Sequence, residues 1–205
     1  MCELQEIISN GEGVQVEFKT EISNQKHLAA TLVAFANGVG GSVLIGVKKS
    51  GKIKGVNPSE EKILLDEAIS MYTKPHVLCD TVVWKVKHYL VVEIKVDQSK
   101  IRHQAKDDQG IWNPFVRIES HTCRTNKIID LAWKLSDSLE ESVKYNEACK
   151  DELILKLQDT HLTLSKLYTE SRFTLKEVDY NLSCLLYIGA IRLSFLEGNI
   201  YYALV

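Results

Sequence analysis

Four lysines crowd a seven-residue stretch of the chain: Lys48, Lys49, Lys52 and Lys54. No acidic residue lies within that stretch. A protruding turn that carries several lysines is suited to contact the phosphates of a nucleic acid, which positions a protein without reading sequence. The same pattern also fits a solvated run of charge, and the residues alone do not choose between these two readings.

Six of the eleven glycines lie between residues 38 and 55, around these lysines. A phosphate-binding glycine loop follows a strand and precedes a helix, whose free N–H groups hold the anion. Here the order is reversed, because a helical pattern ends before Gly38 and a strand-like run begins at Ser42. We therefore predict that Gly38, Gly40 and Gly41 stop a helix and permit a tight entry into a buried strand.

Further positive and aromatic side chains occur later in the chain. Arg117 lies within a strand-like run and Arg124 follows it, and both are predicted to assist the lysines in phosphate contact. Trp112 and Phe115 could stack on bases, although such rings more often anchor a core.

No metal site is predicted. His121 and Cys123 form one His-x-Cys pair, and no second pair completes four zinc ligands. The five cysteines are odd in number and include no C-x-x-C, which indicates free thiols.

The composition is that of an ordinary globular protein, with 205 residues, 45% hydrophobic residues and a net charge of −2. The charge is uneven: up to Lys134 there are 18 basic and 16 acidic residues, and afterwards 7 and 11. The first part is thus the better candidate for a polyanion partner. The acidic start lacks a basic and then apolar leader, and no apolar run has the length of a membrane span, so we expect a cytoplasmic protein with no membrane partner.

Periodicity predicts an α+β domain over residues 1–136, with helices packed on a mixed or antiparallel sheet. The predicted helices cover residues 3–8, 27–37, 60–73 and 126–139. The predicted strands cover residues 13–19, 42–47, 52–56 and 114–120, with two more between 81 and 96 about a turn near Lys87-His88. Residues 97–114 are predicted to be irregular.

The rest of the chain is predicted to hold a helical linker, residues 137–150, and a small domain, residues 151–205. Helices at 151–158, 164–171 and 174–187 precede strands at 190–195 and 199–205, which is the order of a winged helix-turn-helix. Its third helix offsets Lys176 with Glu177 and Asp179, and its hairpin turn at Glu197 has no basic residue. Because phosphate affinity needs Lys or Arg, dimerisation or partner binding is favoured for this domain.

Three motifs in this order resemble the Schlafen-type AlbA-like domain: "GEGVQVEFK" (Gly11 to Lys19), "LVAFANGVGGSVLIGVKKSGKIKGV" (Leu32 to Val56) and "FVRIESHTCRT" (Phe115 to Thr125). The resemblance covers about residues 2–135. It implies an AlbA-like α+β fold and nucleic-acid binding, as in the many bacterial proteins and Schlafen proteins that carry this domain.

In Schlafen proteins the domain can be an endoribonuclease with two glutamates around Glu-Phe-Lys and an acid after Gly-Val. Glu12 and Glu17 match the two glutamates, and the third position falls at Lys48. A lysine there would repel the metal ion, Mg²⁺ or Mn²⁺, that polarises the scissile phosphate. Since a spacing of five puts Glu12 and Glu17 on opposite faces of one strand, a shared site requires Glu12 to lie in the preceding loop.

Three other acids could replace the missing carboxylate: Glu93, Asp97 and Glu119. The sequence does not place them relative to Glu12 and Glu17.

Taken together, the residues and the resemblance predict a nucleic-acid-binding protein without catalysis. This prediction includes DNA binding and a role in transcriptional regulation. Two alternatives stay open: a metal-dependent endoribonuclease that uses Glu12 and Glu17, and a protein-assembly module that binds no nucleic acid. No cofactor is predicted outside the nuclease alternative. DNA and RNA are not distinguished, and a homodimer is expected because small AlbA-like domains expose sheet surface that a second copy could cover.

Overall fold

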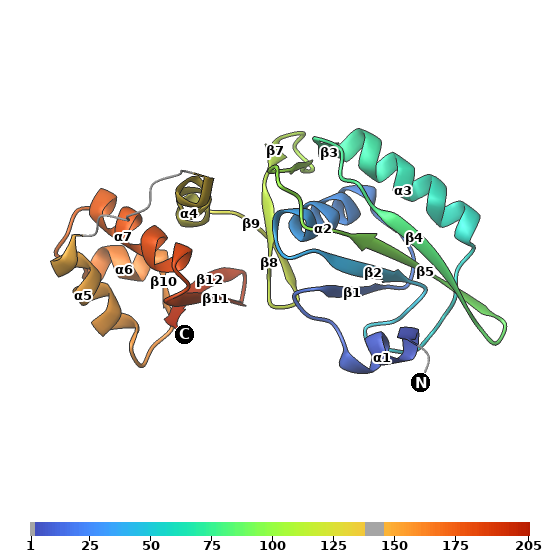
Figure 1. Ribbon diagram of the computed structural model, residues 1–205, viewed down its shortest axis with the longest axis horizontal. Helices are drawn as coiled ribbons and strands as arrows, with labels where there is room; N and C mark the ends of the chain where they lie inside the picture. Colours follow the sequence, from blue (N-terminus) through green and yellow to red (C-terminus); the bar gives the residue numbers. More distant parts are fainter. Residues whose placement is uncertain (1–2, 138–145) are drawn as a thin grey trace. The chain divides into compact units, whose positions relative to one another are not determined.

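A computed structural model describes residues 3–137 and 146–205. The chain forms two compact units, Met1–Arg124 and Thr125–Val205 (Figure 1). Both units combine helices and strands, which confirms the α+β prediction. In the described part of the chain, no helix is both long and apolar enough to cross a membrane.

The first unit is built on a four-stranded mixed sheet in the order β1-β2-β5-β4. Its strands are β1 (Val16–Lys19), β2 (Gly41–Ile45), β4 (Asp80–Val86) and β5 (Tyr89–Val96). Strand β1 runs parallel to β2, and the other neighbours are antiparallel. Lys87, in the turn between β4 and β5, has φ 56, so the turn lies where the sequence predicted it.

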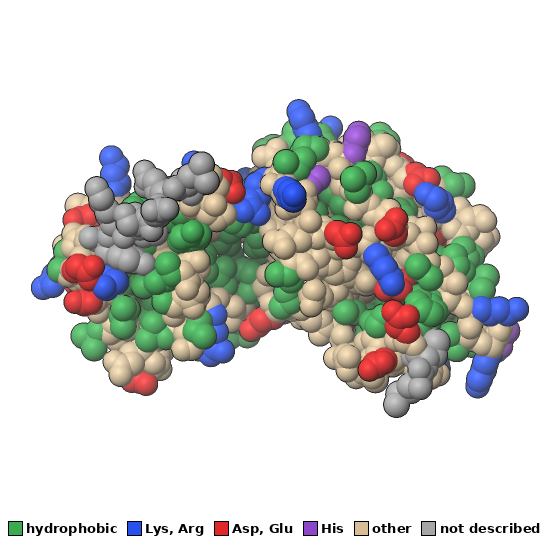
Figure 2. Space-filling view, in the orientation of Figure 1, with side chains coloured by type: hydrophobic (Ala, Val, Ile, Leu, Met, Phe, Trp, Pro, Cys, Tyr) green, Lys and Arg blue, Asp and Glu red, His purple; other side chains and the backbone are tan. Residues whose placement is uncertain are grey.

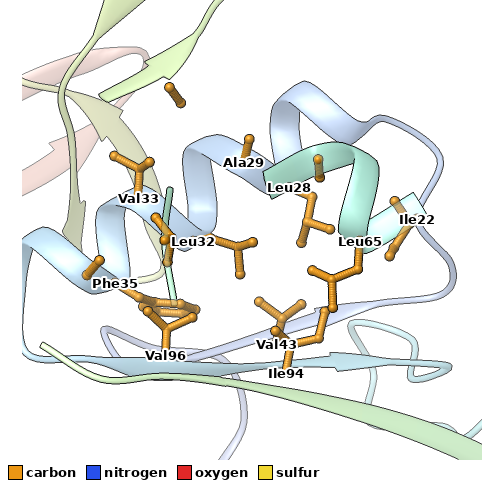
Figure 3. Packing of buried hydrophobic residues seen from close by; sticks show 14 of the residues in the cluster. Ile22, Leu28, Ala29, Leu32, Val33, Phe35, Val43, Leu65, Ile94 and Val96 are labelled. Atoms are coloured by element: carbon orange, nitrogen blue, oxygen red, sulfur yellow. The ribbon is translucent and has the colours of Figure 1, made fainter. Parts of the chain in front are cut away.

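Two helices, α2 (Gln25–Asn37) and α3 (Pro58–Tyr72), cover one face of this sheet. Helix α2 begins at Asn24, whose side-chain oxygen accepts the N–H of His27 at 3.1 Å, a cap of the predicted kind. In Figure 3, leucines and Phe35 of α2 point toward the buried side chains of β2 and β5, with Leu65 of α3 beside them. Apolar residues on all sides bury α2 from Leu28 onward, apart from the half-buried Ala30, while its polar first turn stays accessible.

The short helix α1 (Glu3–Asn10) packs against the opposite face of the sheet. Its Leu4 lies in a cluster with Phe18 of β1, Leu44 of β2 and Val91 of β5. Because alternate residues of a strand face opposite sides, the same strands supply both clusters.

Close packing explains the glycines between α2 and β2. A Cβ on Gly40 would lie 2.8 Å from the carbonyl oxygen of Val96, and Gly40 has φ +77. A Cβ on Gly41 would lie 2.6 Å from the carbonyl oxygen of Gln15 and from the ring of Phe35. The prediction of a helix stop and a tight strand entry is confirmed, since no larger side chain fits here.

The region that the sequence predicted to be irregular contains two short strands, β6 (Gln104–Lys106) and β7 (Trp112–Asn113), which form a small sheet with β3 (Thr73–Lys74). The predicted strand β8 (Phe115–Ile118) pairs with a further strand, β9 (His121–Arg124). Strands β6, β7 and β9, of two to four residues, lack an apolar run, and tertiary pairing creates them.

The second unit contains helices α4 (Lys127–Asp137), α5 (Glu147–Leu157), α6 (Leu164–Glu170) and α7 (Leu175–Tyr187). Strands β10 (Leu162–Thr163), β11 (Ile191–Leu196) and β12 (Asn199–Leu204) form a separate sheet in the order β10-β12-β11. The helices share one apolar core with this sheet, in which Tyr202 is fully buried.

Helix α4 belongs to this second unit, whereas the sequence placed the domain boundary after it, at residue 136. Ile128 is fully buried in the core of the second unit, and Lys127 forms an ion pair with Asp179 of α7. Helix α5 begins at Glu147, inside the predicted linker. Residues 138–145 of that linker lie outside the described residues, and so does the predicted end of the preceding helix at residue 139. A charged stretch in sequence thus did not mark the boundary, because α4 buries one apolar face against α7.

Candidate functional site

A cleft of about 550 Å³ opens in the first unit beside β1 and α2. The chemistry-bearing side chains that line it are Glu12, Glu17, Lys19, Lys26, His27, Thr31, Lys49, Lys106, Asp107, Asp108, Ser120, His121 and Thr122. They come from five separate segments of the chain, and two phenylalanines, Phe18 and Phe115, complete the lining.

The structure brings Glu12 and Glu17 into this one cleft. Glu17 lies on β1, and Glu12 lies in the loop before it, as a shared site requires. Glu12 turns back on the strand, where its Oε1 accepts the backbone N–H of Phe18 at 2.9 Å. That bond fixes the loop relative to β1 and orients the carboxylate.

Glu17 is held by cations and a hydroxyl. Its Oε2 accepts a hydrogen bond of 2.5 Å from Nη1 of Arg117, and its Oε1 lies 2.7 Å from Nζ of Lys19. Thr31 of α2 donates to the same carboxylate, at 3.3 Å for Oε2. Hydrogen bonds to an ionised carboxylate are stronger than hydrogen bonds between neutral groups, so these three donors hold Glu17 firmly.

Arg117 is buried, with 2% of its side chain exposed. Besides Glu17, it donates to the carbonyl oxygens of Gly13 and Ser120, each at 2.9 Å, and its guanidinium lies 5.1 Å from the ring centre of Phe35. A side chain enclosed in this way has no surface for a nucleic-acid phosphate. The prediction of Arg117 as a phosphate contact is therefore corrected: Arg117 positions Glu17 and the β8–β9 hairpin.

Two acids that the sequence reasoning missed, Asp107 and Asp108, line the cleft from the loop after β6. Asp107 accepts the backbone N–H groups of Ile111 and Gln109 and the amide of Asn113, and the bond from Ile111 is the main reason that its pKa lies below the usual value. Asp108 pairs with Lys26 of α2 at 3.2 Å. The Asp107-Asp108-x-Gly110 pattern of a turn was the available signal.

The three proposed substitutes for the missing carboxylate do not line the cleft. Glu93 is buried on β5, where it accepts from Ser42 and from the indole N–H of Trp84. Asp97 follows β5 and lines another pocket, and Glu119 is exposed in the β8–β9 turn.

The cleft does not fit a catalytic divalent cation. Both oxygens of Glu17 already face cationic nitrogens, and a metal would have to displace the buried Arg117. Among the described residues no three His, Cys, Asp or Glu side chains converge as a metal group. We derive no reaction step through a metal.

The four predicted lysines occupy one turn after β2, closed by the bridge between Val47 and Ile53. Lys49 reaches the cleft lining, while Lys48 and Lys52 are exposed beside it. Lys54 pairs with Glu21 at 2.6 Å. This acid lies more than thirty residues earlier in the chain, outside the lysine-rich stretch.

Two other candidates, Arg124 and Trp112, do not line the cleft, whereas Phe115 and His121 do. Arg124 is exposed at the end of β9. Trp112 is half-buried, with Nζ of Lys106 5.7 Å from its ring centre. Cys123 of the His-x-Cys pair is buried, and burial raises the pKa of its thiol to about 11.

The geometry can be compared with known proteins at three levels. The family model described as "Schlafen, AlbA_2" matches residues 12–126, more than half of the chain. This match begins at Glu12 and ends within two residues of the boundary between the units. No curated protein matches the chain.

Two solved structures share 16% identity with it. The DIP2311 protein of Corynebacterium diphtheriae has a TM-score of 0.49, covering 98% of this chain and 38% of that one. The N-terminal domain of an ATP-dependent DNA helicase RecG-related protein from Nitrosomonas europaea has a TM-score of 0.41, covering 55% of this chain and 81% of that one. This chain thus spans well under half of the first, and both TM-scores lie below 0.5.

Proposed function

The chain belongs to the Schlafen AlbA_2 family, and we propose that it binds nucleic acid through the cleft of its first unit, without cleaving it. One observation carries the proposal: lysines from four separate segments, Lys19, Lys26, Lys49 and Lys106, line a single cleft. Convergent lysines of this kind are suited to the sugar–phosphate backbone.

The lining carries four lysines and four carboxylates, Glu12, Glu17, Asp107 and Asp108, so opposite charges are equal in number there. Glu17 pairs with Lys19 and Arg117, and Asp108 pairs with Lys26. Lys49 has no ion-pair partner among the described residues, and the exposed Lys48 and Lys52 belong to the same turn, so this turn offers the charge that a phosphate can meet. Figure 2 shows acidic and basic side chains interspersed over the face in view, which makes a local site a better account than a broad basic surface.

We assign nucleic-acid contact to the first unit and not to α7 of the second. A winged helix would read DNA with this helix. Helix α7 packs against both α4 and α5, and polar side chains on it are buried, among them Asp179, Asn181 and Ser183. Buried residues of α7 are not accessible to DNA, and partner binding or assembly stays the prediction for the second unit. The winged-helix assignment, homodimer formation and transcriptional regulation remain predictions.

The test is a salt series with labelled DNA and RNA and the full-length protein. We expect the logarithm of the binding constant to fall with the logarithm of salt concentration, and the Lys48→Ala/Lys49→Ala variant to lower this slope by about 1.5, since each phosphate contact contributes about 0.7–0.9. The matched control removes two exposed lysines outside the cleft, Lys85 and Lys100. It should leave the slope nearly unchanged.

An equal loss of slope in both variants would show diffuse charge instead of a site. Probe integrity is followed in the same samples with Mg²⁺ or Mn²⁺ added. Cleavage that disappears in Glu17→Gln would replace the binding proposal with the nuclease alternative. Absence of binding to every probe would leave the assembly alternative.

A further inference from the structure

The cleft has the size of a pocket for one small ligand. Its volume of about 550 Å³ lies within the range of roughly 300–1,000 Å³ that small-molecule and cofactor sites occupy. A specific interface with duplex DNA instead buries roughly 1,000–2,500 Å² of protein surface. A single nucleotide has the size of a ligand for such a pocket, whereas a double helix requires the larger interface.

Two of the lysines in the cleft are recessed. The side chain of Lys19 is 23% exposed and that of Lys26 is 31% exposed, whereas Lys48 and Lys52, which do not line the cleft, are exposed. The phosphates of a stiff duplex can meet exposed lysines. Recessed lysines are reached only by a strand whose nucleotides can leave the stack and enter the cleft.

Aromatic side chains line the same cleft beside the lysines. Phe115 is half-buried at the start of β8, and the imidazoles of His27 and His121 also belong to the lining. Flat rings stack on the faces of unpaired bases, which duplex DNA keeps covered by their neighbours. Lysines and rings in one cleft are thus the combination that a single strand requires.

Glu12 supplies a hydrogen-bond acceptor in this cleft. Its Oε1 accepts the N–H of Phe18, and its Oε2 has no partner among the described residues. Glu17, by contrast, has both oxygens occupied by Lys19 and Arg117. The carboxylate of Glu12 would repel a phosphate, but it can accept a hydrogen bond from a base that lies against it.

We propose that the cleft receives one unpaired nucleotide, whose phosphate lies on the lysines and whose base donates an exocyclic N–H to Oε2 of Glu12. This inference rests on the nucleic-acid-binding function proposed above. An ionised carboxylate only accepts hydrogen bonds, so it selects the exocyclic amino groups of cytosine, adenine and guanine over thymine and uracil, which have none. Thymine and uracil present their N3–H between two carbonyl oxygens, which the carboxylate repels.

Fluorescence anisotropy with the full-length protein tests this preference at one fixed salt concentration. The probes are labelled oligo(dC), oligo(dA) and oligo(dT) strands and a hairpin duplex of equal charge. We expect the single strands to bind more tightly than the hairpin. We also expect oligo(dC) and oligo(dA) to bind about tenfold more tightly than oligo(dT), the value of one hydrogen bond to a charged group.

Glu12→Gln is the decisive variant, because the amide oxygen of Gln can still accept from Phe18 while the second acceptor is lost. The ratio of oligo(dC) to oligo(dT) affinity should fall about tenfold toward one. The control, Glu119→Gln, removes an equal charge in an exposed turn outside the cleft and should leave the ratio unchanged. Competition by dCMP and dTMP on the unaltered protein gives a second measurement that needs no variant, with dCMP the better competitor.

Three results would overturn the inference. Equal affinity for hairpin and single strands would show that no nucleotide enters the cleft. A base preference unaltered by Glu12→Gln, or equal competition by dCMP and dTMP, would remove Glu12 from recognition while leaving nucleic-acid binding intact. Absence of binding to every probe would refute the proposed function and this inference with it.

Discussion

Single residues in the cleft divide into those that hold the site and those that are free to meet a ligand. Arg117 belongs to the first kind, because its side chain is enclosed and donates to four different groups: Glu17, Gly13, Ser120 and Thr122. Lys49 belongs to the second kind. Charge alone did not separate them, since both are cations near the family motifs.

Replacement of Arg117 by Met is expected to lower the free energy of unfolding by about 3–5 kcal/mol. The variant leaves Glu17 with the partly exposed Lys19 as its only cation among the described residues, beside the hydroxyl of Thr31, and breaking a buried ion pair from one side is costly. Lys19→Met removes an outer partner and should cost about 1 kcal/mol or less. Urea unfolding of both variants measures the difference, and equal costs would mean that the guanidinium does not hold the site.

At the scale of elements, the first unit joins its pieces with buried polar contacts as well as apolar packing. Glu61, in the first turn of α3, accepts the backbone N–H of Ile22 at 2.9 Å and thereby ties α3 to the segment before α2. Glu61 is 7% exposed, and this burial raises the pKa of its carboxyl above the usual value. A raised carboxyl pKa has a definite consequence for stability.

Glu61 binds its proton more tightly in the folded state than in the unfolded one. Its contribution to stability is therefore full below the unfolded pKa and is lost as pH rises through the folded pKa. Glu61→Gln should match the original protein at about pH 4 and exceed its stability at about pH 7. Urea midpoints at both pH values test this, and a gap of the same size at both would contradict the assigned cause.

At the scale of the whole molecule, two units with separate cores share one chain, and the family match covers only the first. Helix α4 shows how the boundary is drawn. Asn126 bonds to the hydroxyl of Tyr202 at 2.7 Å, Lys127 pairs with the buried Asp179, and Ile128 is fully enclosed. All of these contacts lie within the second unit.

A fragment of residues 125–205 should therefore unfold cooperatively, and a fragment of residues 138–205 should be less stable by at least about 2–5 kcal/mol. The shorter fragment loses a fully buried isoleucine and leaves Asp179 without its cation. Thermal unfolding followed by circular dichroism compares the two. Equal midpoints would mean that α4 does not stabilise the second unit, in agreement with the boundary at residue 136 that the sequence predicted.

The sequence by itself determined the elements whose patterns are long and strongly periodic. Helix α2, the β4–β5 hairpin and the helices and hairpin of the second unit follow from local periodicity and turn residues. For Glu12 the sequence set only a condition: a site shared with Glu17 requires Glu12 to lie in a loop before β1, because a strand cannot present residues five apart on one face, and the structure meets that condition.

Only the tertiary structure decided which charged side chains are free. Arg117 and Lys54 find their acids, Glu17 and Glu21, far away in the sequence, and Asp107 and Asp108 reach the cleft through strands too short to predict. Local patterns report the backbone and its periodicity. Burial and pairing of a charge depend on residues that folding brings from elsewhere in the chain.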